Sequence, residues 1–427
     1  MDPERRQLRS AEPTGLAARY AACRRQSLAL VQGLSDADVT VQSMDDASPA
    51  KWHLAHTAWF FEEFVLVPYA PGYRVRDERY RYLFNSYYEA VGPRHPRPQR
   101  GLLTRPALAE VLAYREHVDA ALLRLCESGL PEAAQALVEL GMQHEQQHQE
   151  LLLTDLLHLF AQNPLKPAYR LEAGGAPSLS AVQRPGWVDF DGGLVDIGHP
   201  GGNFHFDCES PRHQALLQPH ALCTHLVTNR EWGEFIAEGG YRDPRHWLSD
   251  GWRAVQSAQW QAPLYWEQRD GAWWQMTLAG EQPLAPEAPV AHISFFEADA
   301  FARWAGKRLP TEFEWEAAAA RQLVTGNFVD SGRYRPLSAG EDAQAPLKQL
   351  YGDLWEWTSS PYIGYPGFRT APGAVGEYNG KFMNGQYVLR GGSCATPPGH
   401  VRATYRNFFY PHQRWQFMGL RLAEDRP

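Results

Sequence analysis

The sequence predicts an α+β protein in which a four-helix bundle precedes a second, loop-rich domain with short strands. Residues 15–160 hold four long segments whose apolar residues recur at helical spacing. A Pro-, Gly- and Ala-rich connection follows at residues 163–186, and short strands and turns follow it. A chain of 427 residues is also too long to fold around a single hydrophobic core of ordinary size, which indicates two domains. We therefore expect a bundle over residues 1–165, a linker over 166–186 and a second domain over 187–427.

The four expected helices cover residues 15–34, 48–66, 104–126 and 131–160. In the second of them Ser48 suits the N-cap position, because a serine hydroxyl caps a first turn well and Pro49 then takes the first helical position. Helices with this pattern favour a bundle, whose interior commonly holds metal sites. We expect an irregular segment between the second and third helices, because residues 82–103 are rich in Pro, Arg and Tyr.

Composition and charge exclude several classes of protein. The net charge of −8 and the pI near 6.1 argue against binding to nucleic acid or to a membrane surface. No apolar run approaches the roughly 20 residues that span a bilayer, and the first residues lack the apolar core of a signal peptide. The five cysteines are scattered and form no CxxC pair, so neither a disulfide framework nor a cysteine zinc site is indicated. We expect a cytoplasmic protein.

The fourth helix contains an HExxH motif in the stretch "HEQQHQE". On a helix His144 and His148 lie one turn apart on the same face, so both can approach one metal ion. Imidazole suits Zn, Fe, Cu and Ni alike. In a zinc hydrolase of this type Glu145 would be the general base. The third histidine of a metzincin would fall at Thr154, whereas a more distant glutamate ligand stays open.

The second helix offers two further histidines, His53 and His56, in "KWHLAHTAWFFEE". If this helix packs beside the fourth, one of the two completes a three-histidine set. Three neutral imidazoles leave positions open for substrate and O2, as an oxidising iron site requires, and a three-histidine catalytic zinc site is equally consistent. The residues alone predict a metal site and leave its metal open.

Motifs along the whole chain resemble one known family. "SPAKWHLAHTAWFFE", "FNSYYEAVGPRHPRPQRG" and "HEQQHQELLLTD" resemble the DinB-like bundle of ergothioneine-biosynthesis sulfoxide synthases. "FDGGLVDIGH", "RLPTEFEWEAAAA", "YGDLWEWTSS" and "VLRGGSCATP" resemble the formylglycine-generating-enzyme domain, which has a C-type-lectin-like fold. The lectin-like part alone would be unspecific, since one fold serves many activities. The resemblance implies a DinB-like four-helix bundle followed by a C-type-lectin-like domain.

The resemblance also implies a cofactor and a reaction. Non-heme Fe(II) would be held by His56, His144 and His148, which leaves His53 facing elsewhere as an ordinary bundle histidine. Members of this family use O2 to join a sulfur donor to C2 of the imidazole of hercynine (Nα-trimethylhistidine). The trimethylammonium group cannot donate hydrogen bonds, so aromatic faces and polar oxygens suit it.

Candidate residues for binding and catalysis follow from the same motifs. Tyr87 or Tyr88 is expected to donate a proton during the oxidation, which favours coupling over simple thiol oxidation. Arg97 is the expected carboxylate clamp, because a guanidinium binds a carboxylate bidentately. The expected substrate-binding residues are Arg97, Gln147, Asn384, Gln386, Trp415, Gln416 and Phe417.

The donor differs between branches of the family: γ-glutamylcysteine, cysteine, or a selenosugar in the related selenoneine synthases. The stretch "FNSYYEAVGPRHPRPQRG", residues 84–101, resembles the cysteine branch. Where that branch reads "KFMCNQMVLRGGS", this chain reads "KFMNGQYVLRGGS". Gly385 frees space and Asn384 offers amide groups, which suits a bulkier, hydroxyl-rich donor. We therefore place a selenosugar slightly ahead of cysteine. The alternatives from other classes are an HExxH zinc hydrolase and a binding module without turnover.

Overall fold

The computed structural model describes residues 15–171, 186–340, 346–371 and 374–427, and the chain divides into two compact units. Gly92–Leu152 and the described residues up to Tyr87 form the first unit, while Tyr88–Val91 and the chain from Leu153 onward form the second. Helices dominate the first unit, and all strands in the described ranges belong to the second. The predicted α+β class, with the helices first, is confirmed. The domain boundaries at residues 165 and 187 stay predictions.

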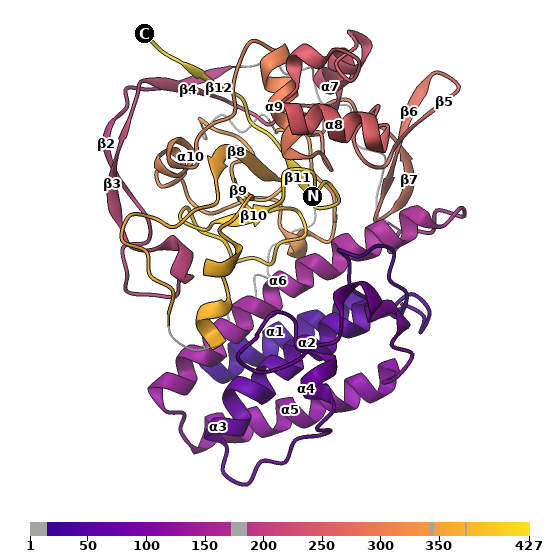
Figure 1. The fold of residues 1–427 in the computed structure, drawn as a ribbon, viewed down its shortest axis with the longest axis vertical. Helices are drawn as coiled ribbons and strands as arrows, with labels where there is room; N and C mark the ends of the chain where they lie inside the picture. Colours follow the sequence, from indigo (N-terminus) through magenta and orange to yellow (C-terminus); the bar gives the residue numbers. More distant parts are fainter. Residues whose placement is uncertain (1–14, 172–185, 341–345, 372–373) are drawn as a thin grey trace, which may run out of the picture. The chain divides into compact units, whose positions relative to one another are not determined.

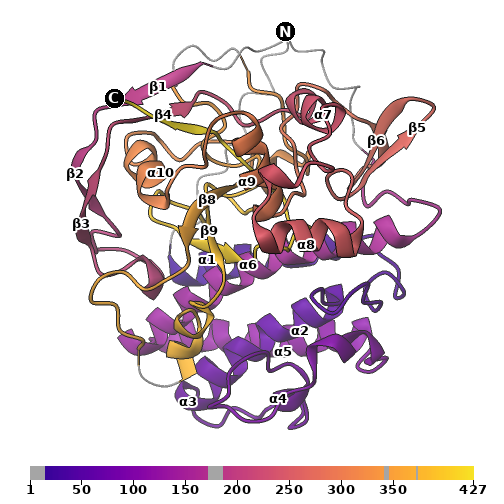
Figure 2. The same ribbon diagram turned by 45° about the horizontal axis from the view of Figure 1, so that its top comes forward.

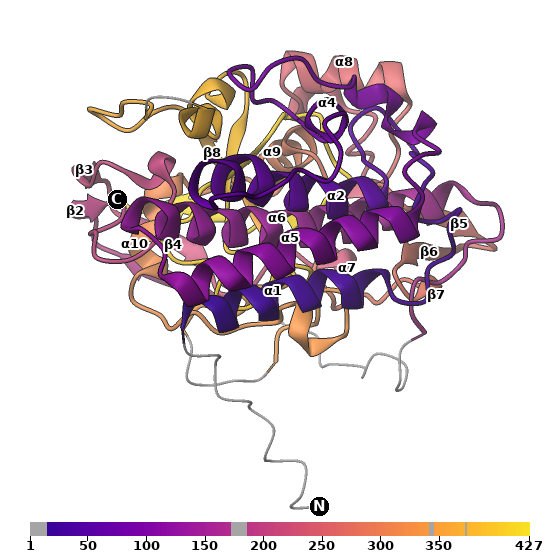
Figure 3. The ribbon, with the colours of Figure 1, turned by 90° about the horizontal axis from the view of Figure 1, so that it is seen from below.

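In its described part the first unit contains four long helices, as predicted, and two short ones (Figure 1). They are α1 (Leu16–Val31), α2 (Ala50–Phe61), α3 (Val67–Tyr69), α4 (Tyr80–Leu83), α5 (Leu108–Ser128) and α6 (Glu132–Gln162), whose residues from Leu153 onward belong to the second unit. Helices α1, α2 and α5 lie alongside α6 (Figure 3). Every residue of α2 is buried, polar and charged ones included. A helix that is buried on all sides is an inner helix, so its histidines lie in the interior of this unit.

Three details of the first unit differ from the sequence-based expectation. Ser48 does not cap α2, whose N-cap position is Pro49; its hydroxyl instead accepts a hydrogen bond of 2.9 Å from Arg100. The helix also does not continue regularly to residue 66, because a π-helical turn occupies Glu62–Leu66. Tyr114 Oη donates to Glu62 in this turn at 2.6 Å. Residues 82–103 are largely irregular, as expected, but contain a 3-10 helix at Arg97–Leu102.

In the described ranges, the second unit contains four small sheets, four helices of its own and the C-terminal end of α6 (Figure 2). The strand orders are β1-β4-β12, β10-β9-β8-β11, β2-β3 and β5-β6-β7. Among these named strands of the described residues, β8 and β11 pair in parallel and the others pair antiparallel. Helices α9 (Phe295–Trp304) and α10 (Glu312–Ala319) pack on β8. The strands are β1 (Trp187–Phe190), β2 (Gly193–Ile197), β3 (His213–Leu217), β4 (His220–Cys223), β5 (Trp266–Arg269), β6 (Ala272–Thr277), β7 (Gly280–Pro283), β8 (Trp355–Pro361), β9 (Tyr387–Arg390), β10 (Asn407–Phe409), β11 (Met418–Gly419) and β12 (Ala423–Asp425).

Three of the four helices of this unit begin at the same local signal. They are α7 (Asn229–Ala237), α9 (Phe295–Trp304) and α10 (Glu312–Ala319), and α8 (Ser249–Ala258) is the exception. Each is preceded by Ser or Thr with Glu three positions later, which forms a capping box. This reciprocal pair satisfies two backbone N–H groups of the first turn. Within the described ranges, no helix is both long and apolar enough to cross a membrane.

Candidate metal centre

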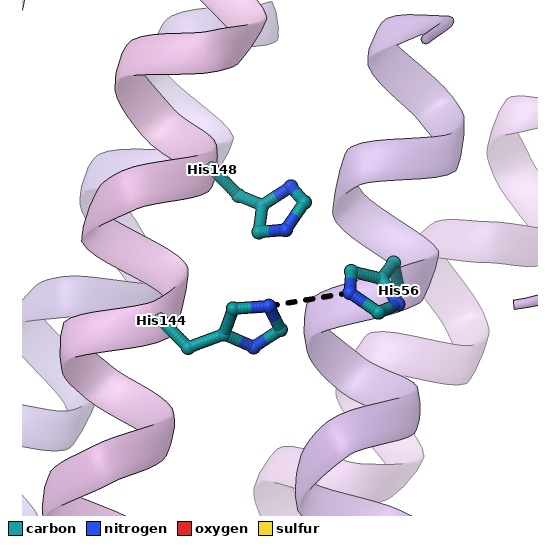
Figure 4. A group of neighbouring side chains, drawn as sticks. All are labelled: His56, His144 and His148. Carbon is teal, nitrogen blue, oxygen red and sulfur yellow. Dashed lines mark hydrogen bonds between the residues drawn. The ribbon is translucent and has the colours of Figure 1, made fainter. Parts of the chain in front are cut away.

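His56, His144 and His148 converge inside the first unit (Figure 4). His56 comes from α2, and the other two lie one turn apart on α6. One ring nitrogen of each lies within 4.8 Å of the other two. The Nε2 atoms of His56 and His144 are 3.2 Å apart. Metal–imidazole bonds of about 2.0–2.1 Å bring two ligand nitrogens to a comparable separation. The three rings therefore have the spacing of a shared metal site.

The orientation of His56 is fixed by its surroundings. Its Nδ1 lies 2.6 Å from the carbonyl oxygen of Phe84, which accepts an N–H bond from a neutral ring in one tautomer only. That tautomer leaves the Nε2 lone pair facing His144. Trp52 and Trp59, one turn to either side on α2, stack on the ring at interplanar angles of 14° and 16°. Helical spacing explains this stack, because residues three or four apart share a face.

A buried cation lies behind this stack. The guanidinium carbon of Arg100 is 3.4 Å from the centroid of the Trp52 ring. Arg100 also donates to the hydroxyls of Ser48 and Ser86, at 2.9 and 3.2 Å. A guanidinium over an indole face is a favourable cation–π pair. Arg100 therefore braces the tryptophan that packs on His56.

Burial keeps the three histidines neutral. It lowers the pKa of His144 to about 3, and it lowers the pKa of His56 and of His148 well below the ordinary value. Neighbouring imidazoles lower the pKa values of His56 and His148 further, since two adjacent rings resist being charged together. Neutral imidazole is the form that binds a metal ion. The donor set therefore suits a transition-metal ion such as Fe(II), for which imidazole is a good ligand.

Glu145, the next residue after His144, belongs to an ion-pair network instead. Arg24 of α1 and Arg115 of α5 each bind one of its carboxylate oxygens at 2.7 Å, and Ser27 donates a further hydrogen bond. Burial alone would raise the pKa of this carboxyl, but the two guanidinium groups outweigh it and lower the pKa to about 2. Asp119 in turn binds Arg24 at 2.7 Å. The carboxylate is permanently ionised and fully engaged.

His53 also lies at this site, so the expectation that it faces elsewhere is wrong. Its Nδ1 is 2.8 Å from the Nδ1 of His148, and only 4% of the residue is exposed. His56 follows His53 by three positions, which places the two side chains next to each other on the helix surface. Spacing alone left open which of the two would join the cluster; the family resemblance selected His56, and the structure brings His56 together with His144 and His148.

The remaining candidate residues of the first unit and of the segment 88–91 differ in how deeply they are buried. Arg97 is exposed, and its guanidinium donates to the carbonyl of Asp46. Tyr87 is half-buried and Tyr88 is completely buried. Gln147 is half-buried on α6, one residue before His148. The buried arginine of residues 82–103 is thus Arg100, which the sequence reasoning did not select.

Trp415, Gln416 and Phe417 are all buried in the second unit. The indole N–H of Trp415 donates to Asp155 at 3.0 Å. The carbonyl of Trp415 and the ring of Phe417 both contact His292, at 3.3 Å for Nδ1 to oxygen and 4.9 Å between ring centroids. This part of the second unit combines aromatic faces with polar atoms.

The loop before β9 holds the other two candidates. Gln386 is buried and its amide donates to the carbonyl of Phe382 at 3.0 Å, whereas Asn384 is exposed. Gly385 has a φ of +69°, and a Cβ added there would meet nothing within 4 Å. A left-handed backbone therefore explains this glycine. The space around this position is open, and its use by a bulkier donor stays a prediction. Tyr387 stacks on Phe295 with ring centroids 3.7 Å apart.

Comparison with known proteins covers both parts of the chain. Residues 19–152 match the DinB superfamily, and residues 176–426 match the sulfatase-modifying factor enzyme 1-like domain. A hercynine oxygenase from Mycobacterium tuberculosis is 32% identical, over 97% of this chain and 99% of its own. The hercynine oxygenase of Mycolicibacterium smegmatis is 34% identical, over 96% and 98% of the two chains. This chain belongs to the hercynine oxygenase family.

Family membership confirms the fold that the sequence motifs implied, a DinB-like bundle followed by a domain of the formylglycine-generating-enzyme type. The second domain is also similar to the formylglycine-generating enzyme of Streptomyces coelicolor, which is 28% identical over 59% of this chain and 96% of its own. The hercynine oxygenases match both domains of this chain, whereas the formylglycine-generating enzyme matches 59% of it. The pairing of the two domains therefore distinguishes the family.

Proposed function

We propose that this protein is an Fe(II)- and O2-dependent oxidoreductase that joins a chalcogen donor to C2 of the hercynine imidazole. In this reaction the C2–H bond and the S–H or Se–H bond of the donor break, and one C–S or C–Se bond forms. O2 accepts four electrons; one of its oxygen atoms stays on the chalcogen as the oxide and the other leaves as water. The proposal rests on the family and on the histidine cluster.

The cluster is the observation that carries the metal assignment. Three neutral imidazoles from two helices converge within 4.8 Å inside one unit, and three ligands leave coordination positions open. We assign His56, His144 and His148 as the ligands. When bound, Fe(II) would supply O2 activation. The chain itself contributes the fixed tautomer of His56 and an aromatic surrounding that restricts access by water.

The geometry around Glu145 disfavours the zinc-hydrolase alternative. A general base needs a pKa near the working pH and a free lone pair directed at its substrate. The carboxylate of Glu145 has a pKa of about 2 and is bound by two arginines and a serine. It is a structural anion and a poor proton acceptor, although the sequence motif is that of a zinc protease.

The remaining roles are proposals from the family motifs. Tyr87 or Tyr88 donates a proton during coupling, Arg97 binds a carboxylate, and Gln147, Asn384, Gln386, Trp415, Gln416 and Phe417 bind substrate. Aromatic rings and amide oxygens are suitable partners for a trimethylammonium group. Exchange of each tyrosine for phenylalanine tests the first role. The catalytic tyrosine is the one whose loss diverts O2 consumption from adduct formation to oxidation of the free donor.

The decisive experiment is anaerobic reconstitution with Fe(II), followed by hercynine, one donor and ¹⁸O₂, with mass spectrometry of the products. We expect a hercynine adduct that carries one ¹⁸O atom and is absent without O2. Zn-loaded protein and the His56→Ala variant are the controls, and both should give no adduct. Activity of the Zn form without O2 would establish a hydrolase, and no turnover with any donor would leave a binding module.

The same experiment assigns the donor when cysteine and a 1-seleno-sugar are supplied in parallel. A selenosugar is proposed first and cysteine second, on the residues of the loop at 381–393. Efficient sulfoxide formation from cysteine would overturn that order and leave the iron-dependent coupling intact.

A further inference from the structure

His53 and His148 form a close pair between α2 and α6. Their Nδ1 atoms are 2.8 Å apart, and their ring centroids are 5.1 Å apart. This distance is that of a good hydrogen bond. His53 does not belong to the group of three whose nitrogens converge. It contacts one candidate ligand, His148, at the Nδ1 atom.

Only one arrangement of protons in this pair suits metal binding by His148. A neutral imidazole carries one N–H and one lone pair. If His53 donated, His148 would accept at Nδ1 and would hold its proton on Nε2, the nitrogen left for the metal ion. If His148 donates from Nδ1, its Nε2 carries the lone pair and can bind the ion. His53 must then accept at Nδ1 and carry its own proton on Nε2.

We propose that His53 is a positioning residue that accepts the Nδ1–H of His148 and so holds the Nε2 lone pair of His148 ready for the metal ion. The inference rests on the proposed function, because it presupposes a metal ion at the cluster. Partners of this kind fix the tautomer and ring orientation of a ligand, and their loss commonly weakens metal affinity 10–100-fold.

His56 supplies an internal comparison. Its Nδ1 faces the backbone carbonyl of Phe84 at 2.6 Å, so a main-chain atom does for His56 what the His53 side chain does for His148. A backbone acceptor cannot be removed by substitution, whereas a side-chain acceptor can. Unlike His56, His148 is therefore a ligand whose orientation a single side-chain substitution can release.

The test measures Co²⁺ affinity of the full chain by competition with a chelator, together with the visible spectrum of bound Co²⁺. His53→Leu removes the acceptor and should weaken Co²⁺ binding 10–100-fold with a changed spectrum. His53→Asn should stay within about threefold of the native protein, because an amide oxygen branching from Cγ can replace Nδ1 as acceptor. Leu54→Ala is the matched control: it truncates the next residue, which is also buried on α2, and should leave Co²⁺ affinity unchanged.

The outcomes separate this inference from the proposed function. Unchanged Co²⁺ affinity in His53→Leu, with the native chain binding Co²⁺ tightly, overturns the role of His53 alone. Equal weakening in Leu54→Ala, or no recovery in His53→Asn, overturns it as well, because the effect would then come from packing. Absence of Co²⁺ binding in the native chain overturns the metal site and this inference together. If His53→Leu does not fold, His53→Asn and His53→Gln form the deciding pair: similar affinities would overturn the inference, whereas weaker binding by the Gln variant, whose amide lies one carbon farther out, would support it.

Discussion

His144 and Glu145 are neighbours on α6, and each is only 1% exposed, yet their surroundings are opposite. His144 faces two other neutral histidines, and Glu145 faces two arginines. The side chains of adjacent helix residues point about 100° apart, so the two side chains contact different neighbouring helices. His144 meets α2, while Glu145 meets α1 and α5. The same five-residue motif thus serves a neutral ligand cluster on one face and a structural ion pair on the other.

This difference teaches how to interpret HExxH in a bundle. The motif fixes which residues share a face, but the partners on other helices decide what each residue does. An isolated buried carboxylate would tend to be protonated, and two guanidinium groups prevent this. Substitutions on the two faces should therefore give different kinds of defect: loss of metal on one and loss of stability on the other.

The largest effect is expected on the histidine face. His144→Ala should abolish adduct formation and lower Fe(II) or Co²⁺ affinity by more than 100-fold, because one of three ligands is lost and outer partners alone account for 10–100-fold. The melting temperature of the metal-free chain should change little by comparison. Product detection measures adduct formation, metal titration measures the affinity, and thermal unfolding measures the melting temperature. His117→Ala, a bundle histidine outside the cluster that contacts the carbonyl of Arg74, should behave like the native protein. Tight metal binding by His144→Ala would remove it from the ligand set.

The second-largest effect is expected on the other face of α6, where Glu145 pairs with two arginines. Glu145→Gln should destabilise the protein by about 3–5 kcal/mol, because it leaves Arg115 buried without its carboxylate partner. Denaturant unfolding measures the change. Glu139→Gln on the same helix is the control, since its partner Arg19 is 46% exposed and such pairs contribute roughly 0–1 kcal/mol. A stable Glu145→Gln variant that loses only turnover would instead indicate a catalytic base.

At acidic pH, the difference in unfolding free energy between the native protein and the Glu145→Gln variant should become smaller. The folded-state pKa of Glu145 is about 2, below its ordinary value of 4.5, so its contribution is complete above pH 4.5 and is lost as the pH falls toward 2. The stability gap should narrow by roughly 3 kcal/mol across this range. Denaturant unfolding of both at several pH values measures the gap, and a constant gap would show that charge at Glu145 is not what stabilises the fold.

The smallest effect concerns the cation behind the histidine face. Arg100→Lys keeps the charge but loses the planar stack on Trp52 and the fixed fork to Ser48 and Ser86. We expect a loss of about 1 kcal/mol in unfolding free energy. Arg97→Lys, at an exposed position three residues earlier, should change stability by less than about 0.5 kcal/mol. Equal effects of the two substitutions would contradict the bracing role of Arg100.

Much of the bundle was predictable because helical periodicity is local information. The spacing of apolar residues placed the four long helices, and the interval of four placed His144 and His148 on one face. Ser48 and Arg97 show where local rules fail. A serine before a proline is a good cap, but here its hydroxyl binds an arginine 52 positions away. Nothing in the sequence distinguishes the buried Arg100 from the exposed Arg97, since each arginine is flanked by similar polar and turn-forming residues.

The sequence by itself determined the helices, the family and the candidate ligands, because these depend on residue identity and short-range spacing. Only the tertiary structure decided that His53 contacts the Nδ1 atom of His148, and that Glu145 is bound by arginines of α1 and α5. Those outcomes depend on which face of each helix meets which neighbour. Packing over distances of 30 to 121 residues sets that choice, and no local pattern encodes it.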